Sequence, residues 1–433
     1  MDTETLEFVE NDQIISLDTP SIIKVIGVGG GGGNAVNHMY KEGIHDVTFV
    51  VCNTDNQALA KSPVPIKLQL GRKITEGLGA GGRPQKAQQA AEESAEDLEQ
   101  MLSDNTKMVF ITAGMGGGTG TGAAPVIAKI AKAKDILTVG IVTIPFAFEG
   151  KRKILQALDG VEEMSKHVDA LLVVNNERLR NVYPDLSMKN AFGKADDTLT
   201  IAAKSIAEII TVEGHINCDF ADVNTIMKDG GVAIMSAGYG EGTGRITKAI
   251  EDALNSPLLN NNNVYEAKRV LLYLSGSDQE DYMIKMEEMA EINEFMNRFD
   301  EDVEVIWGAA YDNTLTEKVK ITLLATGFNL DSLSEIETMR REKEVQLQRY
   351  DDEKAEHDIG RINTAYGQDV TRSVLRKSES DPVMLDLDQM VKTEILDLMD
   401  AYPTYNRDQK ILSEIKALKK SIDFVYKQAQ EED

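Results

Sequence analysis

Several residue types and patterns are scarce in this chain of 433 residues, and each scarcity excludes a class of protein. Aromatic residues make up only 6%, with a single tryptophan, so the cores must be built mainly from aliphatic side chains. Cys52 and Cys218 are too few for a disulfide framework, and they show no metal-ligand spacing. The five histidines show no HxxH or HExxH spacing, which argues against a histidine-ligated metal site. No run of about 18 apolar residues occurs, so no membrane span is expected.

Positive charge is scarce as well. The chain has 46 basic and 72 acidic residues, a formal net charge of −26. Such a chain repels nucleic acid and anionic membranes unless it carries a local basic patch, so no nucleic-acid partner is expected. The first residues are acidic where a signal peptide would be basic. With so few cysteines, a reducing cytoplasm is the expected location.

Short apolar runs alternate with segments of helical composition after a polar lead-in at residues 1–20. Strands are expected at 22–26, 47–51, 108–112, 137–144 and 170–174, and helices at 34–41, 84–101, 122–134 and 151–167. Strands that are apolar on both faces and alternate with helices predict an α/β fold. We expect a Rossmann-like, mostly parallel sheet with helices on both faces over residues 21–195.

A long periodic helix follows at residues 196–213, with few polar interruptions. Residues 214–330 then predict a second, smaller α/β domain. Its expected strands are 231–237, 269–275, 303–307 and 319–326, and its expected helices are 243–255 and 282–298. After that the composition changes: residues 331–380 are polar and mixed in charge, which predicts a flexible linker. Residues 381–433 form a tail with short hydrophobic clusters, and apolar residues from Ile411 onward outline one stripe of a short helix.

The first candidate site is a glycine-rich loop from Gly27 to Asn34, between an expected strand and an expected helix. Glycine lets the backbone approach a phosphate, and a helix N-terminus offers unpaired N–H groups. Gly27, Gly29 and Gly32 fit the GxGxxG pattern of dinucleotide-binding proteins, so a nicotinamide- or flavin-dependent oxidoreductase is one interpretation. A tight turn is another.

The second candidate site is the loop from Gly114 to Gly122, which holds six glycines and two threonines. So many glycines are conformationally costly, and close backbone approach to a ligand is the usual reason for them. Nicotinamide enzymes need one such loop, and a Walker P-loop motif is absent. Neither loop contains Lys or Arg. A bound triphosphate would therefore be neutralised by backbone N–H groups, helix ends and a metal ion, which predicts Mg²⁺.

The sequence GGGTGTG at residues 116–122 resembles the signature loop of the tubulin/FtsZ superfamily. Seven further motifs resemble its FtsZ branch, in the same order: GVGGGGGNAVN from Gly27, NTDNQAL (53–59), PFAFEG (145–150), NCDFADV (217–223), MSAGYGEG (235–242), SPLL (256–259) and ATGF (325–328). The resemblance covers residues 21–328. It implies a GTPase with a GTP-binding domain, a central helix and a C-terminal GTPase-activating domain. It also implies head-to-tail homopolymers, protofilaments, that build the division ring at mid-cell.

The resemblance implies roles for individual residues. Those expected to bind GTP or GDP are Gly29, Gly30, Gly31, Asn34, Asn53, Gly79, Ala80, Gly81, Gly116, Gly117, Gly118, Thr119, Gly120, Glu149, Lys153, Asn176, Phe192 and Asp196. Glycines 29–31 and 116–120 would hold the phosphates, residues 79–81 would lie beside the γ-phosphate, and Glu149 would contact the ribose. No metal-ligating residue is assigned.

Asp196 and Phe192 are expected beside the guanine base. A carboxylate can accept hydrogen bonds from N1–H and the 2-amino group of guanine together, and adenine has no such donor pair. Asp196 would then select GTP, and Phe192 would supply a stacking face. From the residues alone, the N-cap of the long helix is the favoured interpretation of Asp196, since Asp is a favoured cap; only the resemblance favours a guanine contact.

Asn217, Asp219 and Asp222 follow the long helix. Asn and Asp favour turns, so turn chemistry is the simplest interpretation. The resemblance implies instead that they enter the next subunit's nucleotide site and position the attacking water, which would make hydrolysis depend on assembly. A structural filament protein without turnover is the alternative, and these acids argue against it.

Two positions and the tail depart from the family's pattern. Lys153 stands where arginine is usual, with Arg152 just before it, and the γ-phosphate loop reads GAGGRP with Arg83 where asparagine is usual. Residues 402–407, YPTYNR, resemble the tail peptide by which membrane adaptors bind, but 26 further residues follow them. We expect division-ring adaptors to bind this tail.

Overall fold

The computed structural model describes residues 21–328, apart from residues 45, 184, 186, 213, 257–263 and 301. The lead-in, the linker, the YPTYNR segment and the helix expected from Ile411 lie outside the described residues. Within the described part, no helix is both long and apolar enough to cross a membrane.

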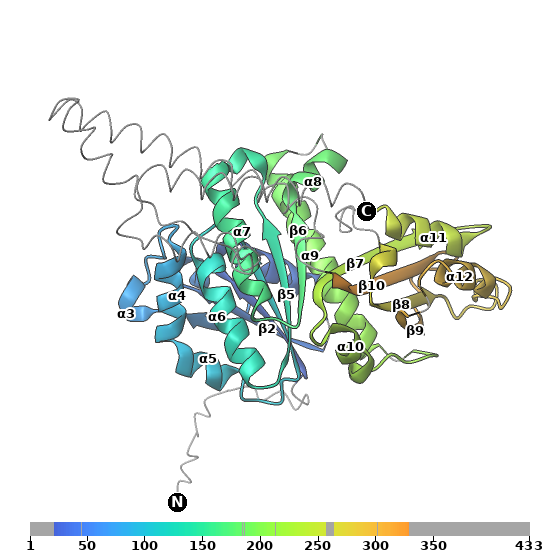
Figure 1. The fold of residues 1–433 in the computed structure, drawn as a ribbon, viewed down its shortest axis with the longest axis horizontal. Coiled ribbons are helices and arrows are strands. Elements are labelled where there is room, and N and C mark those ends of the chain that lie inside the picture. Colours follow the sequence, from blue (N-terminus) through green and yellow to red (C-terminus); the bar gives the residue numbers. More distant parts are fainter. Residues whose placement is uncertain are drawn as a thin grey trace, which may run out of the picture. The chain divides into compact units, whose positions relative to one another are not determined.

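Strands and helices alternate through the first half of the described chain (Figure 1). The strands are β1 (Ile23–Val28), β2 (Val47–Asn53), β3 (Ile66–Gln69), β4 (Met108–Gly114), β5 (Leu137–Ile144), β6 (Ala170–Asn175), β7 (Gly231–Gly240), β8 (Arg269–Gly276), β9 (Glu304–Tyr311) and β10 (Val319–Phe328). The helices are α1 (Gly29–Glu42), α2 (Asn56–Lys61), α3 (Arg72–Thr75), α4 (Pro84–Glu93), α5 (Ala95–Met101), α6 (Thr119–Ala133), η1 (Ala147–Glu149), α7 (Lys151–Ser165), α8 (Asn176–Val182), α9 (Met188–Thr211), α10 (Phe220–Met227), α11 (Arg245–Leu254), η3 (Val264–Glu266) and α12 (Met289–Met296).

The described strands form one sheet in the order β3-β2-β1-β4-β5-β6-β7-β10-β8-β9. The strands from β3 to β7 are parallel, β10 runs antiparallel to both β7 and β8, and β8 pairs with β9 in parallel. The predicted mostly parallel α/β sheet is therefore confirmed. The two expected sheets are continuous with one another, through two residue pairs between β6 and β7.

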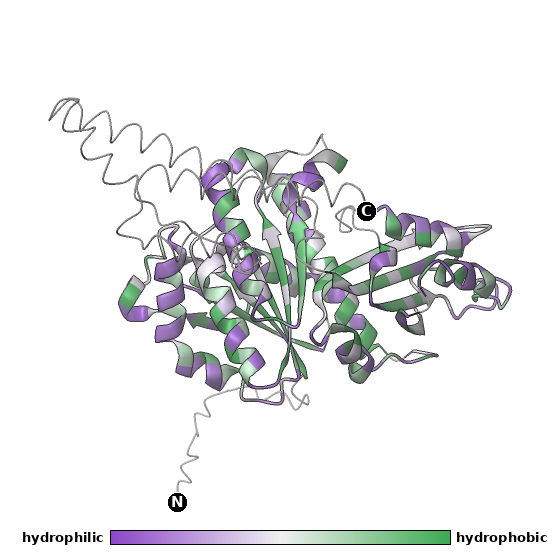
Figure 2. Ribbon diagram, viewed as in Figure 1, coloured by the Kyte–Doolittle hydropathy of each residue, from purple (hydrophilic) through white to green (hydrophobic). Residues whose placement is uncertain are grey.

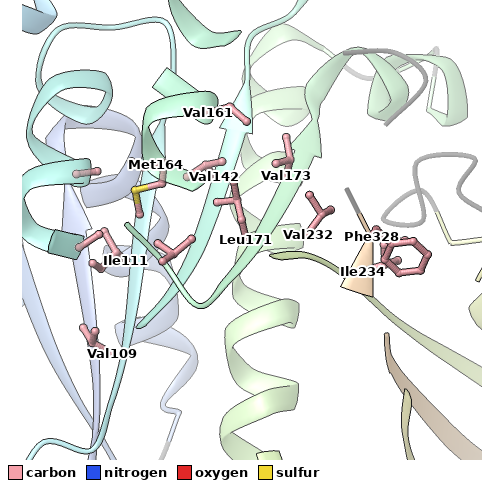
Figure 3. Close-up of a cluster of buried hydrophobic side chains, with 14 of the residues drawn as sticks. Val109, Ile111, Val142, Val161, Met164, Leu171, Val173, Val232, Ile234 and Phe328 are labelled. Atoms are coloured by element: carbon pink, nitrogen blue, oxygen red, sulfur yellow. The ribbon is translucent and has the colours of Figure 1, made fainter. Parts of the chain in front are cut away.

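Buried side chains form one core on each face of the sheet. Along β4, Val109 and Ile111 point to the face covered by α4–α7, whereas Met108 and Phe110 point to the face covered by α1 and α9. This alternation follows from the two-residue period of a strand. Figure 3 shows the first core continuing from Val109 across β5 and β6 to Phe328 at the end of β10. Both cores are dominated by aliphatic side chains, as the composition predicts.

Several expected elements differ at their ends. The long helix α9 has 24 residues and begins at Met188, eight residues before the expected start. The side chain of Ser187 caps it by accepting a hydrogen bond from the Asn190 amide at 3.3 Å. The helix expected at 84–101 is divided at Ser94 into α4 and α5, and β3 was not predicted. The domain limits proposed from the sequence stay predictions.

Candidate nucleotide site

The carboxyl ends of β1, β2, β4, β5 and β6 meet at one edge of the sheet, where parallel α/β folds bind ligands. Both glycine-rich loops lie at this edge, one after β1 and one after β4. α1 begins inside the first loop at Gly29, and α6 begins inside the second at Thr119. Two helix N-termini, each with unpaired backbone N–H groups, therefore open at the same edge and favour an anion there.

The two loops pack so closely that larger residues would not fit. A Cβ atom built on Gly29, whose φ is +73°, would lie 2.8 Å from the Gly120 nitrogen. A Cβ on Gly31 would lie 3.2 Å from the Gly114 Cα. A Cβ on Gly118 would lie 3.0 Å from the Cβ of Ala80, so the second loop also contacts the loop of residues 79–82. These glycines allow three backbone segments to come together.

Other glycines of the same loops face open space. A Cβ built on Gly30, Gly117, Gly81 or Gly82 would meet no atom within 4 Å. Gly81 and Gly82 have φ values of +60° and +69°, which favour glycine by themselves. Packing inside the fold does not require glycine at positions 30 and 117, and these two leave room for a ligand close to the backbone.

Side-chain hydrogen bonds hold the loops in place. The hydroxyls of Thr54 and Thr119 lie 2.7 Å apart, which joins the end of β2 to the start of α6. The Gly116 amide donates to the Thr121 hydroxyl at 2.9 Å. From α7, Gln156 Nε2 donates to the carbonyls of Gly116 at 3.1 Å and Gly117 at 2.7 Å. The second glycine loop is thus fixed from both sides before any ligand binds.

Glu149 and Lys153 lie together beside the second loop. Glu149 Oε1 accepts from the Phe146 amide at 3.0 Å, and its Oε2 lies 3.1 Å from Lys153 Nζ. Lys153 therefore pairs with the residue expected to contact the ribose. Arg152 instead lines a groove between α7 and α4. Asn53, another expected nucleotide residue, is buried, and its Oδ1 accepts from the Asp55 amide at 3.2 Å.

The residues expected around the base include side chains from α8 and α9, and one of them packs against the segment after β5. The ring of Phe192 packs edge-on against Phe146, with centroids 5.1 Å apart, and keeps 39% of its surface exposed. Asn176, the first residue of α8, is 5% exposed, and its Oδ1 has no hydrogen-bond partner in the described part of the chain. An unpartnered buried amide oxygen is costly, and a ligand N–H group would satisfy it.

Asp196 lies on α9, one turn after Phe192. Burial raises the pKa of its carboxyl from 3.8 to about 6; nearby His38 lowers this pKa and Asp197 raises it further. Because α9 begins at Met188, Asp196 lies inside the helix, and the interpretation of Asp196 as its N-cap is wrong. On α1, exposed Asn34 lies one turn before His38, whose Nε2 is 2.8 Å from Asp197 Oδ1.

Asn217 follows α9, Asp219 directly precedes α10, and Asp222 lies in the first turn of α10. Figure 1 shows α10 at the end of α9 away from α8. Asp219 caps α10: its Oδ1 accepts from the amides of Ala221 at 2.8 Å and Asp222 at 3.1 Å. Asp222 Oδ2 accepts from the Asp219 amide at 2.9 Å, which completes a capping box. Asn217 Oδ1 accepts from the Gly214 amide at 2.6 Å. These are the local hydrogen bonds that the turn interpretation predicts. The other carboxylate oxygen of each aspartate takes no part in the capping box.

Comparisons with known proteins show which family this chain belongs to. The GTPase domain of the Tubulin/FtsZ family matches residues 22–184, and the C-terminal domain of the FtsZ family matches residues 231–329. The chain is 51% identical over 427 residues to the cell division protein FtsZ of Porphyromonas gingivalis, which covers 96% of this chain and 91% of that protein. The chain belongs to the tubulin/FtsZ family.

Solved structures support the same family. An empty FtsZ dimer from M. jannaschii is 40% identical with a TM-score of 0.65, covering 72% of this chain and 89% of that one. The GDP-bound monomer of CetZ1 from Haloferax volcanii is 21% identical with a TM-score of 0.64 over 74% of this chain and 99% of that one, and it shares the fold. The resemblance, the fold class and the GTPase activity predicted from the sequence are confirmed.

Sequence analysis missed three side chains that contact residues of the candidate site. Thr54 and Gln156 hold the second glycine loop, and His38 lies beside the carboxyl of Asp196. Thr54 stood within a quoted motif, NTDNQAL, and His38 is one helical turn from Asn34. Gln156 carries no local signal, because its role depends on the packing of α7 against α6.

Proposed function

We propose that this chain is a GTP-hydrolysing cytoskeletal protein that polymerises head to tail and forms the division ring at the septum. The observation that carries the proposal is the separation of two parts of one chain. The glycine loops lie at the carboxyl edge of the sheet, and the acids Asp219 and Asp222 lie at the far end of α9. With 24 residues, α9 is about 36 Å long. One chain cannot bring both to the same phosphate, but two chains stacked end to end can.

In this proposal the glycine loops bind the triphosphate through backbone N–H groups. The open space beside Gly30, Gly81 and Gly117 takes the phosphates, and the two helix N-termini stabilise their charge. Asp196 and Asn176 bind guanine, which supplies the N–H groups that their oxygens need. Phe192 offers an exposed ring face for the base. Glu149, already oriented by Lys153 and the Phe146 amide, binds the ribose.

We infer that Mg²⁺ binds with the nucleotide. The described residues hold no group of three or more His, Cys, Asp or Glu side chains that could cage a metal. Mg²⁺ binds phosphate oxygens and keeps several waters, so it fits a site with hydroxyls and few carboxylates. Thr54 and Thr119 supply those hydroxyls. When bound, the ion neutralises negative charge on the phosphates.

At the junction, the oxygens of Asp219 and Asp222 outside the capping box face the neighbour's γ-phosphate and orient the attacking water. The capping box fixes the two carboxylates relative to one another, which serves positioning. Because the contact joins unlike surfaces, repeated contacts give an open filament rather than a closed dimer. The FtsZ relatives are named cell division proteins, which supports a division-ring role. We place the protein in the cytoplasm at mid-cell, with adaptors bound to the tail.

Two inactive variants test the shared site. Asp222→Asn keeps an oxygen that can accept from the Asp219 amide, but it removes the charge. Gly117→Val places a side chain in open space where a phosphate would lie, with no atom within 4 Å of its Cβ. Gly118→Val is less suitable, since its Cβ would already crowd Ala80 and Arg83 at 3.0 Å.

We expect each variant alone to hydrolyse GTP poorly, and a mixture to release phosphate faster than the sum of both. In the mixture, a Gly117→Val chain donates acids to the GTP held by an Asp222→Asn chain. Co-pelleting confirms that both variants enter the same filaments. Co-assembly without recovery of turnover would contradict the proposal, as would full turnover by monomers diluted below the assembly threshold.

A further inference from the structure

The side of α7 that faces the second glycine loop carries a polar residue, Gln156. In Figure 2, α7 carries hydrophilic residues beside hydrophobic ones, and Gln156 is half-buried next to the buried Ala157. α7 lies directly against the loop, since a Cβ on Gly116 would lie 2.7 Å from the Lys153 carbonyl oxygen. Lys153 and Gln156 are three residues apart on one helix, so both lie on the side next to the loop. Gln156 therefore contacts the loop that is expected to hold phosphates.

The side-chain amide of Gln156 lies among three backbone carbonyls. Its Nε2 donates to the Gly117 oxygen at 2.7 Å and to the Gly116 oxygen at 3.1 Å, and it lies 3.5 Å from the Gly82 oxygen. An amide nitrogen carries two hydrogens and accepts no hydrogen bond, so it suits a position among oxygens. Within the described residues, no other group donates to the carbonyls of Gly116 and Gly117. Gln156 thus sets the direction in which these two carbonyls point.

The direction of a carbonyl fixes the direction of the next amide. No peptide bond of the described residues is cis. In a planar trans peptide, the C=O group and the N–H group of the following residue point in opposite directions. Because Gln156 holds the oxygens of Gly116 and Gly117 toward α7, the N–H groups of Gly117 and Gly118 point away from α7.

These two N–H groups lack an acceptor. Neither the Gly117 nor the Gly118 amide donates to any group in the part of the chain that the structure describes. Gly118 is buried, and a buried N–H group without an acceptor is costly. Both amides directly precede Thr119, where the N-terminus of α6 also favours an anion. A phosphate oxygen would accept from them, and a Cβ on Gly117 would meet no atom within 4 Å, so there is room for it.

We propose that Gln156 is a positioning residue for the nucleotide phosphates: it turns the N–H groups of Gly117 and Gly118 toward them. The proposal rests on the proposed binding of GTP. Gln156 does not touch the nucleotide in this arrangement, because it acts through the loop from the α7 side. Its effect is confined to the phosphates, since the residues expected beside the base, such as Phe192 and Asp196, lie on α9.

Affinities for ligands with and without phosphates test the proposal. Gln156→Met keeps the length of the side chain and removes its donor. The matched control is Gln88→Met on α4, because Gln88 is exposed and its Nε2 donates to Glu92 at 3.0 Å, away from the loop. Binding of guanosine, GDP and GTP is measured on the full-length chain below its assembly threshold. We expect Gln156→Met to bind GDP and GTP at least about tenfold more weakly than the parent and to bind guanosine equally well.

A second substitution restores the donor. Gln156→Lys supplies N–H groups within reach of the same carbonyls and should recover most of the GDP affinity that Gln156→Met loses. Its added positive charge also attracts phosphate over a distance, so Gln88→Lys places the same charge on α4 and should change GDP affinity little. Thermal melting without nucleotide shows whether each variant is folded.

Three results would overturn the proposal while the parent still binds GTP, which leaves the proposed function standing. One is a Gln156→Met chain with unchanged GDP affinity. Another is an equal loss for guanosine and GDP, which a general loosening of the fold would produce. The third is a folded Gln156→Lys chain that binds GDP as weakly as Gln156→Met. A parent chain that binds no GTP would overturn this proposal and the proposed function together.

Discussion

Replacing Asp196 with Asn should stabilise the nucleotide-free protein while weakening GTP binding. Burial raises the pKa of Asp196 from 3.8 to about 6, so the folded chain disfavours the charge that the residue carries at neutral pH. A shift of about two pKa units is worth about 3 kcal/mol. Because the side chain is only partly buried, solvent screening reduces this to about 1–2 kcal/mol. Asn has nearly the same shape and no charge, so it should recover that free energy.

The pH dependence of this stabilisation has a defined sign. The folded chain binds the Asp196 proton more tightly than the unfolded chain does. The contribution of Asp196 to stability is therefore complete below pH 3.8 and is lost as pH rises through about 6. Denaturant unfolding without nucleotide should show the variant more stable than the parent at pH 7.5, with the difference shrinking toward pH 4.5.

GTP binding should change in the opposite direction. Asn presents one oxygen and one amino group to guanine, so one guanine donor meets another donor, at a cost of about 1–3 kcal/mol. That cost corresponds to about 5- to 150-fold weaker binding. Competition with ATP, which the parent should reject, measures the lost selectivity. Asp197→Asn is the control, since Asp197 pairs with His38 at 2.8 Å and is not expected to contact guanine.

Either of two results would refute this reasoning. One is a variant no more stable than the parent at pH 7.5. The other is GTP affinity that Asp196→Asn leaves unchanged. Asp197→Asn should keep GTP affinity and gain no stability.

Two further predictions concern the part of the chain after α9. Asp219→Ala removes the N-cap of α10 and should lower the free energy of unfolding by about 1 kcal/mol, whereas Asp219→Asn keeps a hydrogen-bond acceptor and should lower it less. Both variants should hydrolyse GTP more slowly. Thermal melting measures the loss of the cap, and phosphate release measures the loss of hydrolysis. Arg245→Met should cost about 3–5 kcal/mol, because the buried guanidinium donates to both oxygens of Glu288 and to three backbone carbonyls. GTP affinity should be unchanged in Arg245→Met, and a loss of nucleotide binding at full stability would count against that assignment.

The sequence predicted the elements whose signal is local. Short apolar runs marked β1, β4 and β5, because a strand that is buried on both faces can be recognised from its own residues. The start of α9 was missed because Gly193 and the polar residues around it are poor helix formers. In the structure, tertiary contacts of this segment, such as that of Phe192 with Phe146, override local propensity.

The candidate site also has features that the sequence could predict and features that it could not. The glycine loops could be predicted because a run of glycines is visible in the sequence. The distinction between packed glycines, such as Gly29, and open ones, such as Gly117, could not, because it depends on which backbone lies opposite. The orphan oxygen of Asn176 is likewise a property of the folded pocket.

The narrow join between β6 and β7 has a mechanical consequence. Only Ala170–Gly231 and Leu171–Val232 pair there, fewer than at any other junction of the sheet. α9 runs beside this join and links the nucleotide end of the chain to the end that carries the acids. Under load along a filament, we expect α9 to resist bending and the β6–β7 join to bend. Bending should therefore concentrate at that join, where it breaks the fewest strand pairings, and leave the sheet on either side rigid.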